Sequence, residues 1–554
     1  MWQSICFLAL AHGYGWVMHQ IANGEHLGMF ALLGQGQEHR IHAPAVEDVG
    51  VGAWPDLPLS PEAHQSASDS VRVTSWRLAA IILAGACLMV GSYLRVWATT
   101  PSRAACVKWQ LQVLGYFELY LFGIGASALA PTALSISYQL GHGVNFSGLI
   151  LSSLWMISAP GAVAGRFVAT HTSQFTKRVL QASLIAVASV CYLITAIVTH
   201  DWPVLTDVPR KDTLFIAPRA ICGFVLFMYV SVMFAMVTEV CQPALRVRQQ
   251  LYQNLCLMAG SGTGPMIVAI VTSSTENTAA KSFGLAAPFY VSAALYLFHS
   301  IAAWLVTPGD ADAMKAAAED TCGLDLVGQT MGGALPATLP SDERSLYLRK
   351  LVFWFGNLYG VERAVVTIAL EAATSFVLER YFGWPTSRVA FWVGIVYLLG
   401  TLVAYPMNML KDRMGELYLM KCGSILGVVA SILLAIFIRR AEYVVLIADF
   451  VLFSACFLAS GVAEGMCLAA AIPESPWFNV ETAWCFRNVV KQNLGRFVTP
   501  LLIRGSISHS TALYGVVQVS MTGVGFLLCR GLVDAAYELR ELSDEKGRLS
   551  NRDP

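Results

Sequence analysis

Charged residues are scarce in this chain, and their scarcity excludes a soluble protein. Only 13% of its 554 residues are Asp, Glu, Lys or Arg, whereas 56% are hydrophobic. A soluble domain carries roughly 25% charged residues, so a chain this apolar cannot cover itself with polar surface in water. It must cross a membrane several times. The formal net charge is zero, which leaves no basic face for nucleic acid and no acidic tail.

The motifs of soluble enzymes are missing as well. The sequence contains no HExxH zinc motif, no P-loop and no GxSxG nucleophile elbow. The missing P-loop argues against direct coupling to ATP. The 13 cysteines are scattered and form no CxxC pair, so we expect those in apolar runs to pack as small hydrophobic residues. We therefore expect no enzymatic activity, no metal and no cofactor.

What the sequence has instead is a series of apolar runs of about 20 residues, the length that crosses roughly 30 Å of hydrocarbon. These runs predict helices, because a helix satisfies its own backbone in lipid, and they are too long for the strands of a membrane barrel. They lie at about 77–97, 110–135, 147–169, 179–199, 213–239, 250–273 and 285–306, and then at 350–378, 387–410, 417–438, 443–470, 487–506 and 511–533.

This pattern predicts an all-α polytopic protein with six core helices, a loop and six more, preceded by one or two extra helices. Residues 5–18 are ambiguous between a signal-like segment, a marginal span and an incorrect gene start, and residues 38–75 read as a disordered loop. The expected parts are an N-terminal extension (1–109), a first bundle (110–307), a central cytoplasmic loop (308–345), a second bundle (346–535) and a charged tail (536–554).

An internal repeat supports the division into two halves. Residues 248–254 read RQQLYQN and residues 487–493 read RNVVKQN, so Arg248 and Arg487 open the fifth helix of each half. Each copy continues into an apolar run with a proline further on. Repeats inside a membrane chain are typical of two packed halves with a site between them. Loops rich in Lys and Arg alternate with poorer ones, which predicts that both ends of the core face the cytoplasm.

The loop after the eighth helix carries the run Lys411, Asp412, Arg413, Met414, Gly415. It resembles the D-R-x-G signature of the major facilitator superfamily, in which the Asp and Arg clamp the two halves on the cytoplasmic side and the glycine allows a tight turn. The matching loop of the first half keeps only part of this pattern. It has Arg166 but no aspartate, which puts a gating role there in doubt.

Two further stretches carry a resemblance. Gly260, Gly264 and Pro265 are similar to the superfamily's G-x-x-x-G-P motif in the fifth helix, where helix packing and a role in coupling both remain open. Residues 378–390, LERYFGWPTSRVA, are similar to the junction of the seventh and eighth helices in SPX-domain vacuolar phosphate transporters and their lysosomal relatives. This chain has no region that resembles an SPX domain.

The resemblance implies a 12-helix secondary transporter that moves a small-molecule substrate across a lipid bilayer by alternating access. We expect a monomer, with protons as the coupling ion and an anion as the preferred substrate class. The alternative is a membrane receptor or scaffold that kept the fold without transporting. Neither the substrate nor the membrane, plasma membrane or endomembrane, follows from the sequence.

Charged residues inside apolar runs are the candidates for the site, because each costs about 2.5–3.5 kcal/mol at the centre of a membrane helix. The substrate and coupling candidates are Glu118, Arg219, Glu362, Arg363, Glu371, Asp449 and Arg496. Glu118, Glu362 and Glu371 are the candidates for a coupling proton, and Glu118 and Glu362 can share a cavity if the first and seventh helices face each other. For His299 we favour a single packed histidine over a proton relay.

Several candidates have a second interpretation. Glu362 and Arg363 can form an internal pair, or Arg363 can bind an anion through its planar fork. Glu371 lies 2.5 turns from Glu362 and therefore on roughly the opposite face of the helix. Arg219 can meet an anion or snorkel, with Asp449 as its counterpart in the second half. Near the cytoplasmic ends, Glu239 and Glu464 are expected to pair with Arg246, Arg248, Arg487 or Lys491 as gate contacts.

Overall fold

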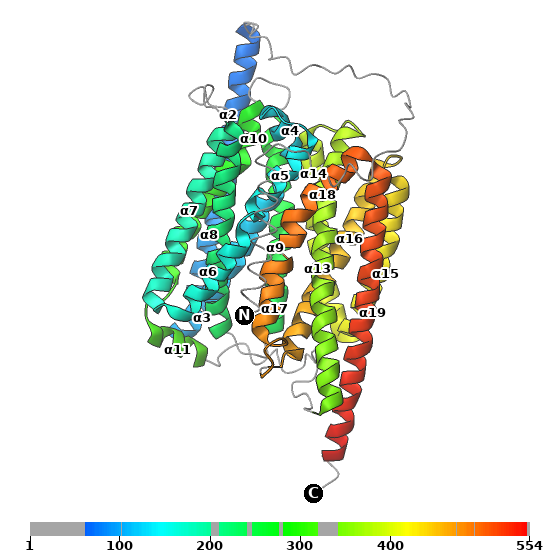
Figure 1. Cartoon of the computed structure of the whole chain (residues 1–554). Coiled ribbons are helices and arrows are strands. Elements are labelled where there is room, and N and C mark those ends of the chain that lie inside the picture. The colour runs from blue at the N-terminus through cyan, green and yellow to red at the C-terminus, as the bar shows by residue number, and fades with distance from the viewer. Residues whose placement is uncertain are drawn as a thin grey trace. The chain divides into compact units, whose positions relative to one another are not determined.

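Helices make up the regular structure of this chain in the computed structural model (Figure 1). The structure describes residues 61–100, 102–200, 210–240, 246–275, 281–319, 342–472, 474–491 and 493–550, all within one compact unit. The predictions for residues 1–35, for the start of the 38–75 loop and for most of the central loop fall outside these ranges.

The first half of the core follows one extra helix, α2 (Pro61–Thr99). Its elements are α3 (Arg103–Ser127), α4 (Ala133–Gln139), α5 (Val144–Ser152), η1 (Ser153–Trp155), α6 (Ser158–His171), α7 (Gln174–Thr199), α8 (Lys211–Val240), α9 (Arg246–Thr272) and α10 (Lys281–Val306). A short helix in the central region, α11 (Ala311–Glu319), follows this half.

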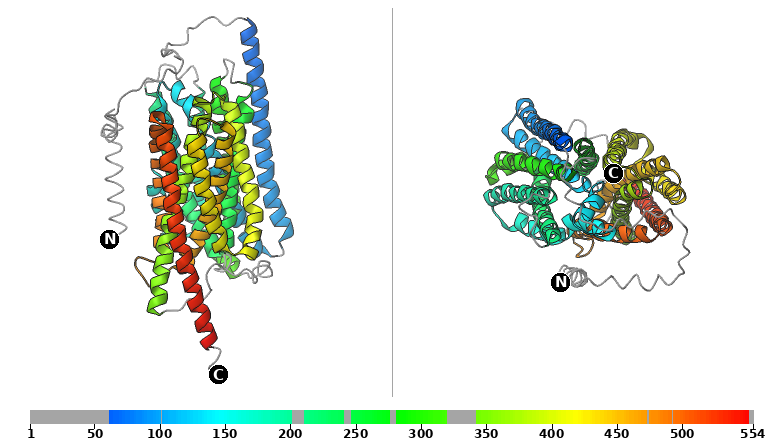
Figure 2. Two further views of the ribbon diagram at one scale, coloured as in Figure 1. Left: turned by 90° about the vertical axis from the view of Figure 1, so that its right-hand side faces the viewer. Right: turned by 90° about the horizontal axis from the view of Figure 1, so that it is seen from above.

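The second half repeats the arrangement with longer helices. Its elements are α13 (Glu343–Arg380), α14 (Thr386–Met414), α15 (Glu416–Phe437), α16 (Glu442–Ala470), α17 (Val480–Cys485), η4 (Phe486–Lys491), η5 (Asn493–Val498), α18 (Thr499–His509) and α19 (Thr511–Ser550). Seen from above, the two halves lie side by side, the first in blue to green and the second in yellow-green to red (Figure 2).

The prediction of a disordered loop at 38–75 is wrong from residue 61 onward, because α2 already begins at Pro61. Proline suits the first position of a helix, where its missing N–H has no partner to lose. Glu62 and Ala63 follow it and are good helix formers. The helix therefore starts well before the apolar stretch at 77–97 that marks it in the sequence.

Two helices predicted as single runs are interrupted. The run at 147–169 breaks after Ser152 into a 3₁₀ turn before α6 resumes at Ser158. The run at 487–506 contains two π-helical segments, η4 and η5. The interruptions touch each other, since Ser152 Oγ donates to Phe497 O at 2.7 Å. π-Helical segments are rare in proteins, and those that occur are often found at functional sites.

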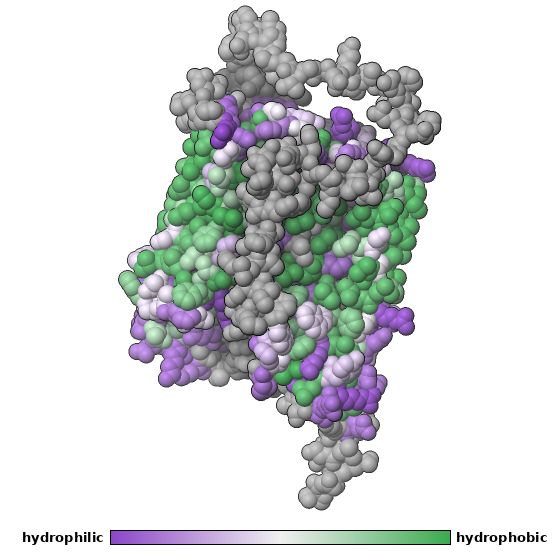
Figure 3. All heavy atoms as spheres, viewed as in Figure 1, coloured by the Kyte–Doolittle hydropathy of each residue, from purple (hydrophilic) through white to green (hydrophobic). Residues whose placement is uncertain are grey.

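Ten helices of the described residues are long and apolar enough to cross a membrane, by length and composition. Three core segments are not among them: α3, α13 and the interrupted α17–α18. These carry charged candidates such as Glu118, Arg363 and Arg496. On the face shown in Figure 3, hydrophobic residues form a belt across the middle of the described part, and hydrophilic residues gather above and below it.

The glycines of the G-x-x-x-G-P motif bring α9 against two different helices. A Cβ atom at Gly260 would collide with Tyr120 O, and one at Gly264 with Ile124 O, so both glycines pack α9 on α3 within the first half. Gly262 lies between them and faces Leu398 of α14 in the second half. Close backbone approach between helices is the packing interpretation of this motif.

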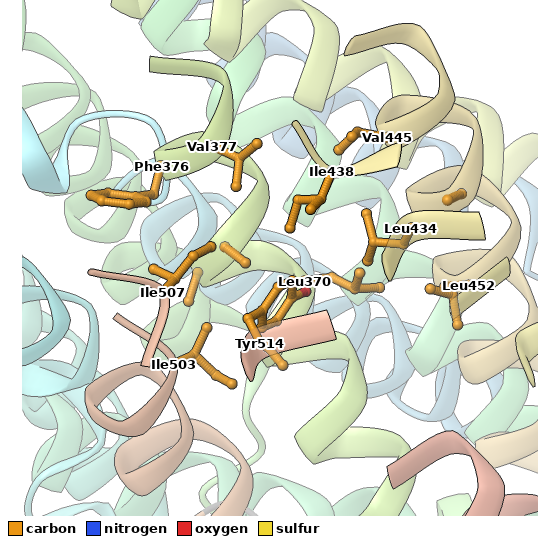
Figure 4. Close-up of a cluster of buried hydrophobic side chains, with 14 of the residues drawn as sticks. Leu370, Phe376, Val377, Leu434, Ile438, Val445, Leu452, Ile503, Ile507 and Tyr514 are labelled. Atoms are coloured by element: carbon orange, nitrogen blue, oxygen red, sulfur yellow. The ribbon is translucent and has the colours of Figure 1, made fainter. Parts of the chain in front are cut away.

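An apolar cluster holds five helices of the second half together. Leu370 of α13, Leu434 of α15, Leu452 of α16, Ile503 of α18 and Tyr514 of α19 are at most 4% exposed and pack into one core (Figure 4). This core fixes the rotation of α13 about its axis. It thereby decides which residues of α13 face the other half.

The two halves meet along two seams. In one, the continuous helices α9 and α14 pack through Gly262 and Gly394, where a Cβ at Gly394 would press on Met266. In the other, α5 packs on α18, where Gly148 lies against the backbone of Pro500. Gly415, between α14 and α15, has a φ of 83°, the left-handed conformation that favours glycine. The tight turn of the D-R-x-G resemblance is therefore present.

Candidate functional site

A cavity of about 90 Å³ lies between the two halves and is lined by residues of both. A water molecule needs roughly 15 Å³ of such space, so the cavity holds several waters or one small solute. The first half contributes residues of α3, α8 and α9, and the second half contributes residues of α13, α16, η4 and η5. The interrupted eleventh helix therefore forms part of the wall.

The wall from the first half is apolar except for one amide. It consists of Leu119, Phe122, Phe227, Val230, Asn254 and Leu257. Phe122 and Phe227 meet edge to face with ring centroids 5.6 Å apart, and Trp155 packs against both of them. The result is a rigid aromatic surface with no charge.

The wall from the second half carries all the charged residues that line the cavity. They are Arg363, Glu464, Arg487, Lys491 and Arg496. Thr367 and Ser460 add hydroxyl groups to the same wall. Among the side chains that the structure describes, charge in this cavity therefore lies on the side of the second half, opposite the aromatic surface.

Arg496 links the two walls. Its guanidinium carbon lies 4.5 Å from the ring centre of Trp155, so the cation stacks across the seam on the first half. Glu371 of α13 interacts electrostatically with Arg496. Ala364, Ile368 and Glu371 are spaced to share one face of α13. Glu371 therefore continues the cavity-facing stripe by one turn.

Glu362 and Arg363 form the internal pair that one interpretation of the sequence predicts. Arg363 Nε donates to Glu362 Oε2 at 2.5 Å and Nη2 donates to Oε1 at 2.7 Å, with both side chains at most 4% exposed. Nη1 reaches Cys456 Sγ at 3.5 Å. A Cβ atom at Gly525 of α19 would collide with both members of the pair. The pair thus closes on α13 itself and packs against Gly525 of α19, and Arg363 also borders the cavity.

Glu464 holds the two cations of the η4 segment. It forms an ion pair with Lys491, and its Oε2 lies 3.6 Å from Arg487 Nε. Lys491 Nζ also donates to Ser460 Oγ at 3.0 Å. Arg487 and Lys491 are the partners expected for Glu464 from the sequence. Arg487 reaches the first half as well, with its guanidinium 5.2 Å from the ring centre of Phe234.

Glu118 does not share the cavity with Glu362, and that expectation is wrong. Glu118 is fully buried inside the first half, where its Oε2 lies 3.2 Å from His299 Nε2. The same nitrogen lies 3.3 Å from Tyr229 Oη. The cavity is instead lined by the next residue, Leu119. Neighbouring residues of a helix point about 100° apart, so a carboxylate one position away turns into the bundle.

Arg219 and Asp449 are also inside their bundles and do not line the cavity. Arg219 Nε donates to Ser153 Oγ at 2.9 Å, and its guanidinium lies 5.6 Å from the ring centre of Phe289. Asp449 lies beside Thr374 of α13. The two residues lie on equivalent helices of the two halves, α8 and α16, but contact different partners.

The remaining gating candidates fall into two groups. Arg166 lies 5.9 Å from the ring centre of Trp484 and so joins α6 to α17 across the halves, whereas Glu239 is exposed. The side chains of Arg248, Lys411, Asp412 and Arg413 lie outside the described part of the chain. Their proposed gating role stays a prediction.

Two buried or cavity-lining cations, Lys491 and Arg504, were not among the substrate candidates chosen from the sequence. Lys491 lines the cavity, and its position one turn after Arg487 already placed both on one helix face. Arg504 is fully buried at the α5–α18 seam, where its Nη2 donates to Ser375 Oγ at 3.2 Å. An arginine in an apolar run was the signal for both Arg496 and Arg504.

Two six-helix halves that enclose a polar site in a membrane chain define a class of protein, the secondary transporters. The family model described as Major Facilitator Superfamily matches residues 116–500. The chain belongs to this superfamily and is one of its secondary transporters. No curated protein matches the chain in sequence.

Solved structures of this superfamily share the fold. The xylose transporter XylE from E. coli, in a partially occluded inward-open conformation, has a TM-score of 0.54 and 14% identity over 75% of this chain and 97% of its own. A POT family transporter has a TM-score of 0.52 and 12% identity over 78% of this chain and 96% of its own. A bacterial homologue of the human lysosomal transporter Spinster has a TM-score of 0.50 and 13% identity, with 79% and 95% covered. At these identities the likeness concerns the fold alone.

Proposed function

We propose that this protein moves a small anion across a membrane by alternating access, with the anion held in the central cavity. The observation that carries the proposal is the charged wall from the second half, with its four cationic side chains. Three carboxylates accompany them, namely Glu362, Glu371 and Glu464. The described groups at the cavity thus hold one net positive charge when all are ionised, which favours an anion over a neutral solute.

Arg496 is the residue we assign to the anion. Arg363 has two nitrogens on Glu362, and Arg487 and Lys491 both contact Glu464. Arg496 instead stacks on Trp155. A cation–π contact of this kind holds the charge without pairing the guanidinium with a carboxylate, so N–H donors of Arg496 can serve a planar anion. The short similarity of residues 378–390 to phosphate transporters also supports an anionic substrate.

Glu371 is the carboxylate we assign to a coupling proton. It interacts with Arg496, the group that the anion would occupy. An anion on Arg496 therefore competes with Glu371 for the same positive charge. A buried carboxylate that loses its cation is costly, so Glu371 binds a proton when the anion binds. Proton and anion would then cross together.

The test is uptake into proteoliposomes of radiolabelled phosphate and of small radiolabelled carboxylates, with and without an inward proton gradient. We expect saturable uptake of at least one anion and its loss in Arg496→Gln. Arg530→Gln is the matched control, because Arg530 is 67% exposed on α19 and pairs only with Asp534 among the described residues. Glu371→Gln should keep exchange of the anion while losing its response to the proton gradient.

The alternative is a receptor or scaffold that kept the fold without transporting. It predicts no uptake or exchange of any anion in liposomes that contain folded protein. It also predicts unimpaired signalling when the cavity is blocked, for example by Ala364→Trp beside Arg363. Uptake that Arg496→Gln leaves unchanged would overturn the anion site and leave the substrate class open.

A further inference from the structure

We propose that the substrate is an amphipathic organic monoanion, with a carboxylate-like head on Arg496 and an apolar, ring-sized body against the first half. This inference rests on the proposed function and narrows its substrate class. It starts from the contrast between the two walls of one small cavity: charged side chains on one side and an aromatic surface on the other.

The apolar wall selects against polar solutes. Phe122 and Phe227 expose ring surface to the cavity, and Leu119, Val230 and Leu257 complete the wall. A sugar or nucleoside bound there would press hydroxyl groups against carbon, where an unpaired hydroxyl costs a few kcal/mol. An apolar body on the same wall instead gains from leaving water. Inorganic phosphate would use the charged wall and gain nothing from this surface.

The charged wall selects the head group. The guanidinium of Arg496 stacks on Trp155, and Trp155 in turn packs on Phe122 and Phe227. Arg496 and the aromatic surface therefore lie side by side in this arrangement of the halves. A planar carboxylate suits the fork of an arginine. The attached body then reaches the wall that carries the two phenylalanines.

Charge and size set the remaining limits. Four cations face three carboxylates among the described groups at the cavity, so the site favours an anion over a neutral solute, and one carboxylate head suits the single arginine assigned to it. A volume of about 90 Å³ suits a compact molecule in this arrangement of the halves. A ligand of this kind contacts both halves at once. It would therefore favour the closed, substrate-occluded arrangement of the halves over either open one.

The test measures how four probes stabilise the purified full-length protein against thermal unfolding, since a ligand of the folded state raises apparent stability by mass action. The probes are benzoate, its neutral analogue benzamide, acetate and inorganic phosphate. We expect benzoate to bind at least about tenfold more tightly than acetate, because a buried ring adds apolar area. Benzamide should bind more weakly than benzoate by a similar factor, because it lacks the charge.

Two substitutions locate the two parts of the ligand. Val230→Thr adds a hydroxyl to the apolar wall without changing its shape, and it should weaken benzoate about threefold while leaving acetate unchanged. Val190→Thr is the matched control, because Val190 is 53% exposed on the outside of α7. Arg496→Gln should weaken both acids, which separates the head group from the body.

Different results of this binding test would overturn the amphipathic substrate and the proposed anion transport. Phosphate or acetate binding that equals or exceeds benzoate binding would overturn the amphipathic substrate and keep anion transport. Equal binding of benzamide and benzoate would overturn the role of the charge. The proposed function itself fails under two joint results. The purified protein unfolds cooperatively but no anion raises its unfolding temperature, and liposomes that contain the protein take up no anion.

Discussion

The two halves of this transporter have the same fold but place their buried charges differently. In the first half, Glu118 pairs with His299 and Arg219 binds Ser153, all inside the bundle. In the second half, Asp449 also stays inside the bundle, but five charged residues of α13, α16 and the interrupted eleventh helix line the central cavity, namely Arg363, Glu464, Arg487, Lys491 and Arg496. The cavity is therefore built from one charged wall and one apolar wall.

This difference separates two roles that a charge in a membrane protein can have. An ion pair closed within one half moves with that half as a rigid body and holds its helices together. A charge that faces the other half changes its surroundings whenever the halves rock. Only the second kind can sense a substrate. Substitutions at four positions test this division of roles between the halves.

The largest effect is expected from Gly525→Ala. The added methyl group would collide with the Glu362 carboxylate and the Arg363 guanidinium at once. Separating a buried ion pair costs about 3–5 kcal/mol, so we expect a large loss of stability in detergent, seen as a lower unfolding temperature. Gly523→Ala is the control on the same helix, because a Cβ there meets nothing within 4 Å. Equal stability of the two variants would contradict close packing of the Glu362–Arg363 pair against Gly525.

The next effect concerns the charged wall. Arg496→Gln removes the cation on Trp155 and should weaken anion binding by about 2–5 kcal/mol, as for loss of one partner of a buried charge pair. Arg496→Lys keeps the charge without the fork and should recover only part of the affinity. Isothermal titration of each purified variant with benzoate measures the dissociation constant. Full recovery in the lysine variant would show that a point charge suffices.

A smaller effect, of a different kind, is expected in the first half. Glu118→Gln keeps a polar group beside His299 but removes its charge, and should cost about 1 kcal/mol of stability because a charge-assisted contact becomes a neutral one. It should leave the affinity for the anion within about twofold, because no contact with the cavity is lost. Unfolding and titration of the same preparation check both points. A tenfold loss of affinity would contradict the sorting of charges between the halves.

The smallest effect is expected at the contact between the walls. Trp155→Phe keeps an aromatic ring under Arg496 but reduces its surface and its attraction for a cation. An interaction of this kind is worth about 0.5–2 kcal/mol, and only part of it is lost. We expect the dissociation constant for benzoate to rise about twofold to fivefold. An unchanged dissociation constant would mean that Trp155 does not position Arg496.

The sequence predicts the two-half fold because apolar runs and the Arg–Gln–Asn repeat are linear features. The repeat even marks the cavity, since Asn254 of the first copy and Arg487 of the second both line it. The cost of a charge in lipid identified Arg363 and Arg496, which both border the cavity. These inferences need only spacing and composition.

The orientation of each helix about its axis could not be predicted in the same way. Glu118 and Leu119 differ by about 100° in direction, and only packing decides which of them faces the cavity. In α13 the apolar core around Leu370 sets that rotation. The breaks at Ser153 and in η4–η5 leave no trace in hydropathy, because they change hydrogen bonding and not composition. These breaks place Trp155 and Arg496 in contact.

The measurement that tests the central claim most directly is equilibrium binding of radiolabelled benzoate and phosphate to three purified proteins: wild type, Arg496→Gln and Arg219→Gln. Both arginines are buried in the membrane part, but only Arg496 lines the cavity. We expect that whichever anion binds the wild type binds Arg219→Gln with an unchanged dissociation constant. We expect binding at least about tenfold weaker in Arg496→Gln. Loss of binding in Arg219→Gln with full binding in Arg496→Gln would place the anion site in the first half and contradict the account.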